Sequence, residues 1–68
     1  MEFIASCYRG VASLLKPGAP FLDYDLFTIL GGIETHIGMM QEAGMTRVSR
    51  TWDDGHAAVL VGHGKRAL

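Results

Sequence analysis

The feature that most constrains this fold is an apolar stripe at helical spacing, followed by a glycine stop and two β-rich segments. Six side chains recur at steps of three and four residues: Leu26, Ile29, Leu30, Ile33, Ile37 and Met40. At about 100° per residue, all six lie within an arc of about 100°. The spacing predicts an amphipathic helix over 24–43, with Asp23 or Asp25 as its N-terminal cap.

Two adjacent glycines interrupt this stripe. Gly31 and Gly32 each cost about 0.5–1 kcal/mol relative to alanine in a helix interior. One interpretation is a continuous helix over 24–43. The other is a short helix over 24–30, a glycine turn, and a second helix over 33–43. Propensity alone does not decide between them, so both stay open.

The segment after the helix has the pattern of a β-hairpin. Gly44 stands where a left-handed C-terminal cap belongs, with Met45 as its hydrophobic partner. Residues 46–52 are rich in β-formers and 57–62 are almost wholly apolar, and Asp-Asp-Gly between them is a turn signal. Alternation predicts that Val48 and Trp52 point to the same side of their strand. A lone ribbon is marginal in water, so the second strand must pack on helices or on another chain.

Residues 2–16 predict a first helix whose apolar side faces the core. That side carries Phe3, Ile4, Cys7, Tyr8, Val11, Leu14 and Leu15. Pro17 and Gly18 end the helix. Cys7 is expected to be buried there as a small hydrophobe. The predicted fold class is α+β, with two or three helices followed by a C-terminal β-hairpin.

The chain is short for its apolar content. Its 68 residues, 49% of them hydrophobic, predict a single small domain over 1–68. A domain of this size buries only about 60% of the surface that its unfolded chain exposes. One core cannot cover so much apolar surface, which predicts a homo-oligomer or a tightly bound protein partner.

The sequence also suggests a compartment. Cys7 is the single cysteine, which excludes a disulfide within one chain and suits a reducing environment. No run approaches the roughly 18 uninterrupted apolar residues of a membrane span. Glu2 stands where a signal peptide would carry positive charge. We therefore expect a cytoplasmic protein that does not enter a membrane.

Catalytic and metal-binding signatures are weak in this sequence. His56 and His63 fall on opposite strand faces, and zinc needs about four ligands at workable spacing. The glycine pair is not followed by the lysine of a phosphate-binding loop, and no nucleophile elbow is present. So small a chain also leaves little volume for a ligand pocket of about 300 Å³ or more. We expect no enzyme activity, no metal and no cofactor.

A protein-binding surface accounts for more of the residues. Arg47, Arg50, Trp52 and Tyr24 are of the types that dominate protein interfaces. Met39 belongs to a methionine cluster that can form an adaptable contact surface. For Trp52 an alternative stays open, in which its ring caps the hydrophobic core.

One part of the chain resembles a known family of DNA-binding proteins. The string IETHIGMMQEAGMTRV resembles the end of the recognition helix in MarR- or ArsR-like winged-helix regulators. The string WDDGHAAVLV looks like their wing, and together the two cover residues 33–61. The resemblance implies a winged-helix-like outline and a dimeric transcriptional regulator. Its implied DNA contacts are Thr35 and His36 from the helix, and Arg47, Arg50 and His56 from the wing.

The distribution of charge determines which of these two predicted functions is favoured. No Lys or Arg lies between Lys16 and Arg47, and the supposed reading helix carries Glu34 and Glu42. Affinity for DNA comes largely from cations that neutralise phosphates. The favoured prediction is therefore a non-catalytic protein-binding module, a small adaptor, regulator or inhibitor that self-associates. The winged-helix DNA-binding regulator is the alternative.

Overall fold

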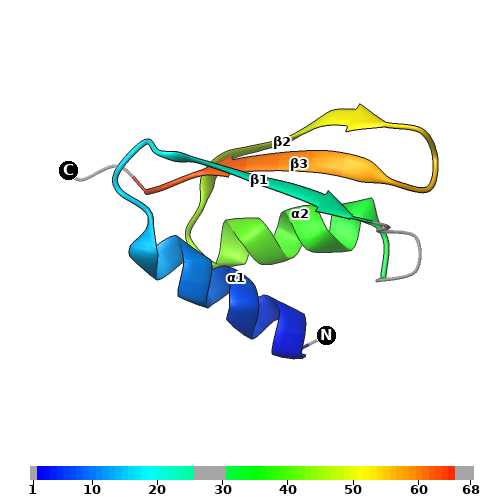
Figure 1. Ribbon diagram of the computed structural model, residues 1–68. Helices are drawn as coiled ribbons and strands as arrows, with labels where there is room; N and C mark the ends of the chain where they lie inside the picture. Colours follow the sequence, from blue (N-terminus) through cyan, green and yellow to red (C-terminus); the bar gives the residue numbers. More distant parts are fainter. Residues whose placement is uncertain (1, 26–30, 66–68) are drawn as a thin grey trace.

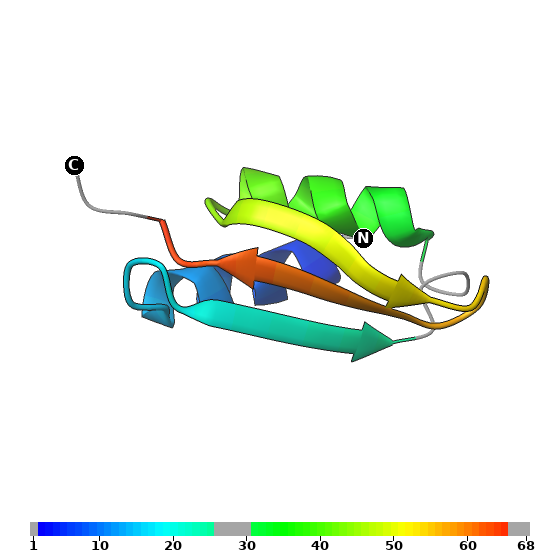
Figure 2. The same ribbon diagram turned by 90° about the horizontal axis from the view of Figure 1, so that it is seen from above.

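Two helices pack on one face of a three-stranded antiparallel sheet in the computed structural model, which describes residues 2–25 and 31–65. The element order is α1 (Glu2–Leu14), β1 (Pro20–Asp25), α2 (Ile33–Glu42), β2 (Thr46–Asp53) and β3 (Ala58–His63). The strand order is β1-β3-β2, so β3 is central. Figure 1 shows both helices below the sheet, and Figure 2 looks down on the uncovered side. The α+β class is confirmed.

Helix α1 ends two residues before the predicted boundary at 16. Pro17 and Gly18 follow it, as the sequence indicated, and the chain then turns into β1. This turn lies against the residue after β3: the Gly18 N–H donates to the Gly64 carbonyl, and the Gly64 N–H donates to the Ala19 carbonyl, both at 2.9 Å. The end of α1 is thereby tied to the end of the central strand.

Strand β1 corrects the prediction that a helix begins at residue 24. Residues 20–25 pair with β3 throughout, from Pro20 opposite His63 to Asp25 opposite Ala58. Asp23 therefore lies inside a strand and caps no helix, and Asp25 is the last residue of the same strand. A continuous helix over 24–43 is wrong. Residues 26–30, which include Leu26, Ile29 and Leu30 of the stripe, lie outside the described residues.

Helix α2 begins immediately after the glycine pair, as the second interpretation predicted. Gly31 and Gly32 have φ angles of 101° and 97°, a region that only glycine enters readily. The predicted C-terminal cap is confirmed: Gly44 has φ 104°, and the Met45 N–H donates to the Met40 carbonyl at 3.1 Å. Local backbone sterics thus set both ends of α2.

The hairpin lies within one residue of its predicted boundaries. In the turn, Asp54 Oδ1 accepts the N–H groups of His56 at 2.9 Å and Ala57 at 2.8 Å. These two backbone donors lower the pKa of the Asp54 carboxyl from its usual value.

Strand β2 contains two register shifts that alternation did not predict. One lies between Thr46 and Ser49, and the other lies between Arg50 and Trp52. Val48 packs toward the buried cluster, whereas Trp52 pairs with Val59 on the opposite face. The expectation that these two side chains share a side is wrong, because an extra residue in one strand shifts the alternation.

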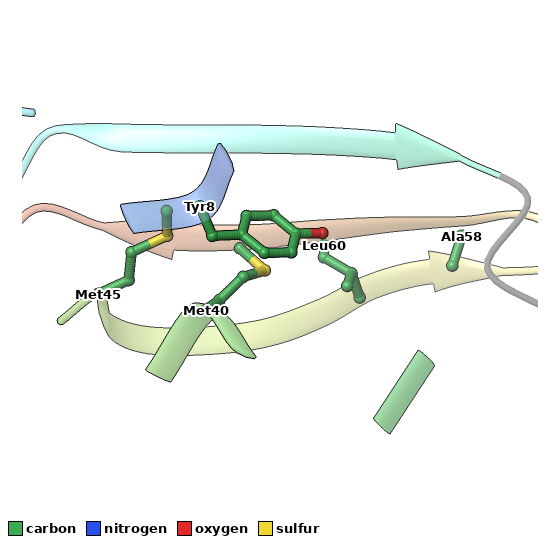
Figure 3. Packing of buried hydrophobic residues seen from close by; sticks show 5 residues of the cluster. All are labelled: Tyr8, Met40, Met45, Ala58 and Leu60. Atoms are coloured by element: carbon green, nitrogen blue, oxygen red, sulfur yellow. The ribbon is translucent and has the colours of Figure 1, made fainter. Parts of the chain in front are cut away.

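The core lies between the helices and the sheet, as Figure 3 shows. Its buried hydrophobic cluster consists of Tyr8, Met40, Met45, Ala58 and Leu60. Cys7 is exposed, which corrects its predicted burial, because α1 buries only the narrow stripe around Tyr8. Within the described residues, neither helix is long and apolar enough to cross a membrane.

Candidate functional site

The side of the sheet away from the helices is the strongest candidate site, and we call it the outer face. In β3, Ala58 and Leu60 are buried under the helices, so the alternate residues point outward. Cross-strand partners share a face, which assigns nine residues to the outer face. They are Pro20, Leu22, Tyr24, Thr46, Ser49, Trp52, Val59, Val61 and His63.

This face is largely apolar and open. Leu22 is 63% exposed, Tyr24 is 67% exposed and Trp52 is 48% exposed. Val59 and Val61 run between them along the central strand and are half-buried. None of the nine outer-face residues is Asp, Glu, Lys or Arg. Single exposed apolar residues are ordinary, but a contiguous set on one face marks an interaction surface.

The rings of Tyr24 and Trp52 stack on this face, although their strands are not neighbours. Both residues pair with Val59 of the strand between them, one from β1 and one from β2. Their ring centroids are 6.3 Å apart. Trp52 therefore does not cap the core beneath the helices, and its part in a protein contact stays a prediction.

The other predicted contact residues lie elsewhere. Arg50 is opposite the buried Leu60, and its guanidinium lies 3.6 Å from Glu34 Oε1 on α2. Arg47 is exposed at the first register shift of β2, with φ 51°. Met39 packs partly buried against the core from α2. The structure therefore brings together Tyr24 and Trp52 of the predicted set, and not these three.

Sequence reasoning missed the aliphatic part of the outer face. Leu22 was hidden because residues 20–25 were not recognised as a strand. The alternation of apolar and acidic residues in Leu22-Asp23-Tyr24-Asp25 was the available signal. The second strand was predicted correctly, and its Val59 and Val61 were expected to pack either on helices or on another chain's sheet, without a choice between the two.

The residues proposed for DNA contact are scattered. Thr35 is exposed on α2 and His56 is exposed in the hairpin turn, whereas His36 is only 2% exposed. Glu34 and Glu42, also on α2, are exposed. In this arrangement the described surface of α2 offers carboxylates where a DNA-reading helix needs cations.

His36 instead belongs to a chain of hydrogen bonds through Asp23, Tyr8 and His36, which links β1, α1 and α2. The Tyr8 hydroxyl donates to Asp23 Oδ2 at 2.6 Å, and its oxygen lies 2.7 Å from His36 Nδ1. Because the hydroxyl has one proton, which goes to Asp23, His36 Nδ1 carries the proton of the second bond. Burial, and then the hydrogen bond to Asp23, raises the pKa of Tyr8. Asp23 and His36 lie 15 and 28 positions from Tyr8 in the sequence. No sequence signal pointed to the hydrogen bonds that join them.

Comparison with known proteins adds no assignment. Scans of family models and searches among characterised proteins and solved structures found nothing similar to this chain. The winged-helix resemblance therefore stays a prediction. Among residues 2–25 and 31–65, no group of three or more His, Cys, Asp and Glu side chains is placed to hold a metal ion.

Proposed function

We propose that this protein is a non-catalytic protein-binding module that self-associates through its outer face. The observation that carries the proposal is the placement of Leu22, Tyr24 and Trp52. All three are about half exposed or more on one face, while both described helices cover the other. Removing such apolar surface from water contributes about 25 cal/mol per Å².

A second copy of the chain is the partner that fits this face. None of the outer-face residues is Asp, Glu, Lys or Arg, so two copies can oppose each other without contacts between like charges of these residues. Two sheets pack face to face about 10 Å apart, with side chains from both inner faces interdigitating. Tyrosine and tryptophan are also the residue types that most often dominate contact energy.

Face-to-face packing is favoured over edge pairing at β2. The two register shifts in β2, together with the left-handed backbone at Arg47, interrupt the regular row of groups that another strand would need. Such irregularities protect sheet edges from pairing with other chains.

Sedimentation velocity over a concentration series tests the proposal. The natural chain should sediment as a concentration-dependent monomer and dimer. Leu22→Lys introduces a positive charge into the proposed contact face of each copy and should weaken association about tenfold or more. The matched control is Leu14→Lys, which makes the same change at a residue 86% exposed on α1, off the outer face. The control should associate like the natural chain.

Two results would contradict the proposal. One is a natural chain that stays monomeric at millimolar concentration. The other is an equal loss of association in both lysine variants, which would point to a charge effect and not to the face. The alternative function, DNA binding, predicts duplex affinity that falls steeply with salt, and fluorescence anisotropy with labelled duplex measures it.

A further inference from the structure

The outer face differs from one end of its strands to the other. Cross-strand pairing divides its nine residues into three rows that run across the sheet. They are a ring row of Tyr24, Val59 and Trp52, a middle row of Leu22, Val61 and Ser49, and a proline row of Pro20, His63 and Thr46. The ring row lies near the β2–β3 turn, and the proline row lies at the opposite end of the sheet (Figure 2). The two exposed aromatic rings therefore stand at one end, and smaller side chains stand beside His63 at the other.

The two ends of the sheet also differ in charge. Beyond the ring row, Asp53 and Asp54 are exposed at the β2–β3 turn. Arg50 lies 3.7 Å from Asp53 Oδ2 and 3.6 Å from Glu34 Oε1, so the carboxylates at this end outnumber that cation. Exposed cations lie beyond the proline row, on Arg47 and Lys65. One end of the sheet is therefore acidic and the other is basic.

Two copies can bring their outer faces together in two ways. Sheets that pack face to face keep their strands within about 30° of alignment, and a two-fold axis relates the copies. If the axis runs along the strands, each row faces the same row of the other copy, and charges of the same sign meet at each end. If the axis runs across the strands, each ring row faces a proline row, and each acidic end lies beside a basic end.

We propose, on the basis of the proposed function, that the proline row is the docking site for the Tyr24–Trp52 ring pair of a second copy. Tyr24 of one copy then lies over Pro20 of the other, and Trp52 lies over Thr46, because β1 faces β1 and β2 faces β2. Small side chains leave room for the rings, and the His63 imidazole offers them an aromatic surface. Opposite charges meet at both ends, which favours this arrangement over the one that joins like ends.

The helix side of the sheet offers a different place for a ring. A cavity of about 310 Å³ lies there between α1, β1 and α2, which corrects the expectation that so small a chain leaves little volume for a pocket. A ring of a second copy bound in this cavity would join two different surfaces. Such a contact leaves both surfaces free at the ends of the assembly and builds chains instead of a closed dimer. The outer face, paired with itself, closes at two copies.

Cross-linking of the natural chain tests the arrangement. Unlabelled and ¹⁵N-labelled chains are mixed, so that peptides linked between copies carry both isotopes. A carbodiimide joins a lysine amine directly to a carboxylate, and it should link Lys65 of one copy to Asp53 or Asp54 of the other. Within one chain the same residues stand at opposite ends of the sheet, about 25 Å apart.

A short amine-to-amine linker supplies the complementary measurement. In the proposed arrangement the two copies of Lys65 lie at opposite ends of the dimer, roughly 25–30 Å apart, and should not be linked to each other. If like ends meet, the two copies of Lys65 lie only about 10 Å apart, which is the spacing between the sheets, and the linker should join them.

Lys65→Glu tests the same contact through affinity. The substitution places a carboxylate beside the acidic end of the other copy and should weaken association about fivefold in sedimentation. Arg9→Glu makes the same change of net charge on the exposed surface of α1, and it should associate like the natural chain. If like ends meet, Lys65→Glu only replaces one like-charge contact by another and should leave the affinity unchanged.

The results distinguish this inference from the proposed function. A dimer in which two copies of Lys65 are linked, or in which Lys65 is not linked to Asp53 or Asp54, overturns the docking site and leaves self-association through the outer face in place. Equal loss of association in Lys65→Glu and Arg9→Glu also overturns it, as does growth beyond the dimer. A natural chain that stays monomeric overturns the inference together with the proposed function.

Discussion

Tyr24 and Trp52 stack across the central strand, with ring planes inclined by 27°. They come from the two edge strands β1 and β2, and Val59 lies between their backbones. Aromatic pairs of this kind contribute about 0.5–1.5 kcal/mol beyond the area that they bury. The contact therefore holds two exposed rings in one arrangement before any partner binds, which lowers the entropy lost on association.

Trp52 is the single tryptophan of the chain and should report association directly. Dimer formation through the outer face removes water from its indole ring. Its fluorescence emission should therefore move to shorter wavelength as protein concentration rises. Leu22→Lys should suppress the shift and Leu14→Lys should retain it. Emission that stays constant while sedimentation shows a dimer would place the contact elsewhere on the molecule.

Tyr8→Phe should destabilise the fold by about 1–3 kcal/mol, because it removes the two hydrogen bonds that the Tyr8 hydroxyl makes with Asp23 and His36. Urea unfolding measures the change in the free energy of unfolding. Tyr24→Phe is the matched control, since it removes a hydroxyl from an exposed side chain and should cost less than about 0.5 kcal/mol. Equal losses of unfolding free energy in the two variants would show that the hydrogen bonds of the Tyr8 hydroxyl contribute no more to stability than an exposed hydroxyl does.

Tyr8 should also make the fold sensitive to alkali. Its pKa is raised in the folded chain above the ordinary 10.0, chiefly by burial. Its contribution to stability is therefore complete below pH 10, where tyrosine is neutral in both states. It is lost as pH rises above 10, because the unfolded chain then releases the phenol proton more readily. Between about pH 9 and pH 11.5, the free energy of unfolding should fall more steeply in the natural chain than in Tyr8→Phe. If the free energy of unfolding falls equally with pH in the natural chain and in Tyr8→Phe, the Tyr8 phenol is not buried in its neutral form.

Gly64→Ala should destabilise the fold by roughly 1–3 kcal/mol. A Cβ at this position would lie 2.1 Å from the Lys16 carbonyl oxygen, a backbone atom that cannot move without opening the turn after α1. Gly10→Ala, in the exposed part of α1, has nothing within 4 Å of the added atom and should stabilise by about 0.5–1 kcal/mol. Thermal unfolding compares the two. If the thermal unfolding midpoint of Gly64→Ala is at or above that of the natural chain, the backbone of Gly64 does not lie as close to the Lys16 carbonyl as described.

The parts of the fold that follow from neighbouring residues could be predicted from the sequence. The end of α1 shortly before Pro17, the start of α2 after Gly32, the cap at Gly44 and the Asp-Asp-Gly turn each depend on a few adjacent residues. Backbone sterics and local hydrogen bonds determine them wherever the segment lies in the molecule. The aromatic members of the outer face, Tyr24 and Trp52, were also found from their residue types.

The tertiary structure alone decided what depends on distant segments. β1 is a strand because β3, more than thirty residues later, supplies its hydrogen bonds, whereas the local apolar spacing placed its last two residues, Tyr24 and Asp25, at the start of a helix. The register shifts in β2 placed Val48 and Trp52 on opposite faces, and the approach of α1 to α2 joined Tyr8 to His36. Strand pairing, exposed faces and cavities depend on which distant segments come into contact. Local propensity does not specify those contacts.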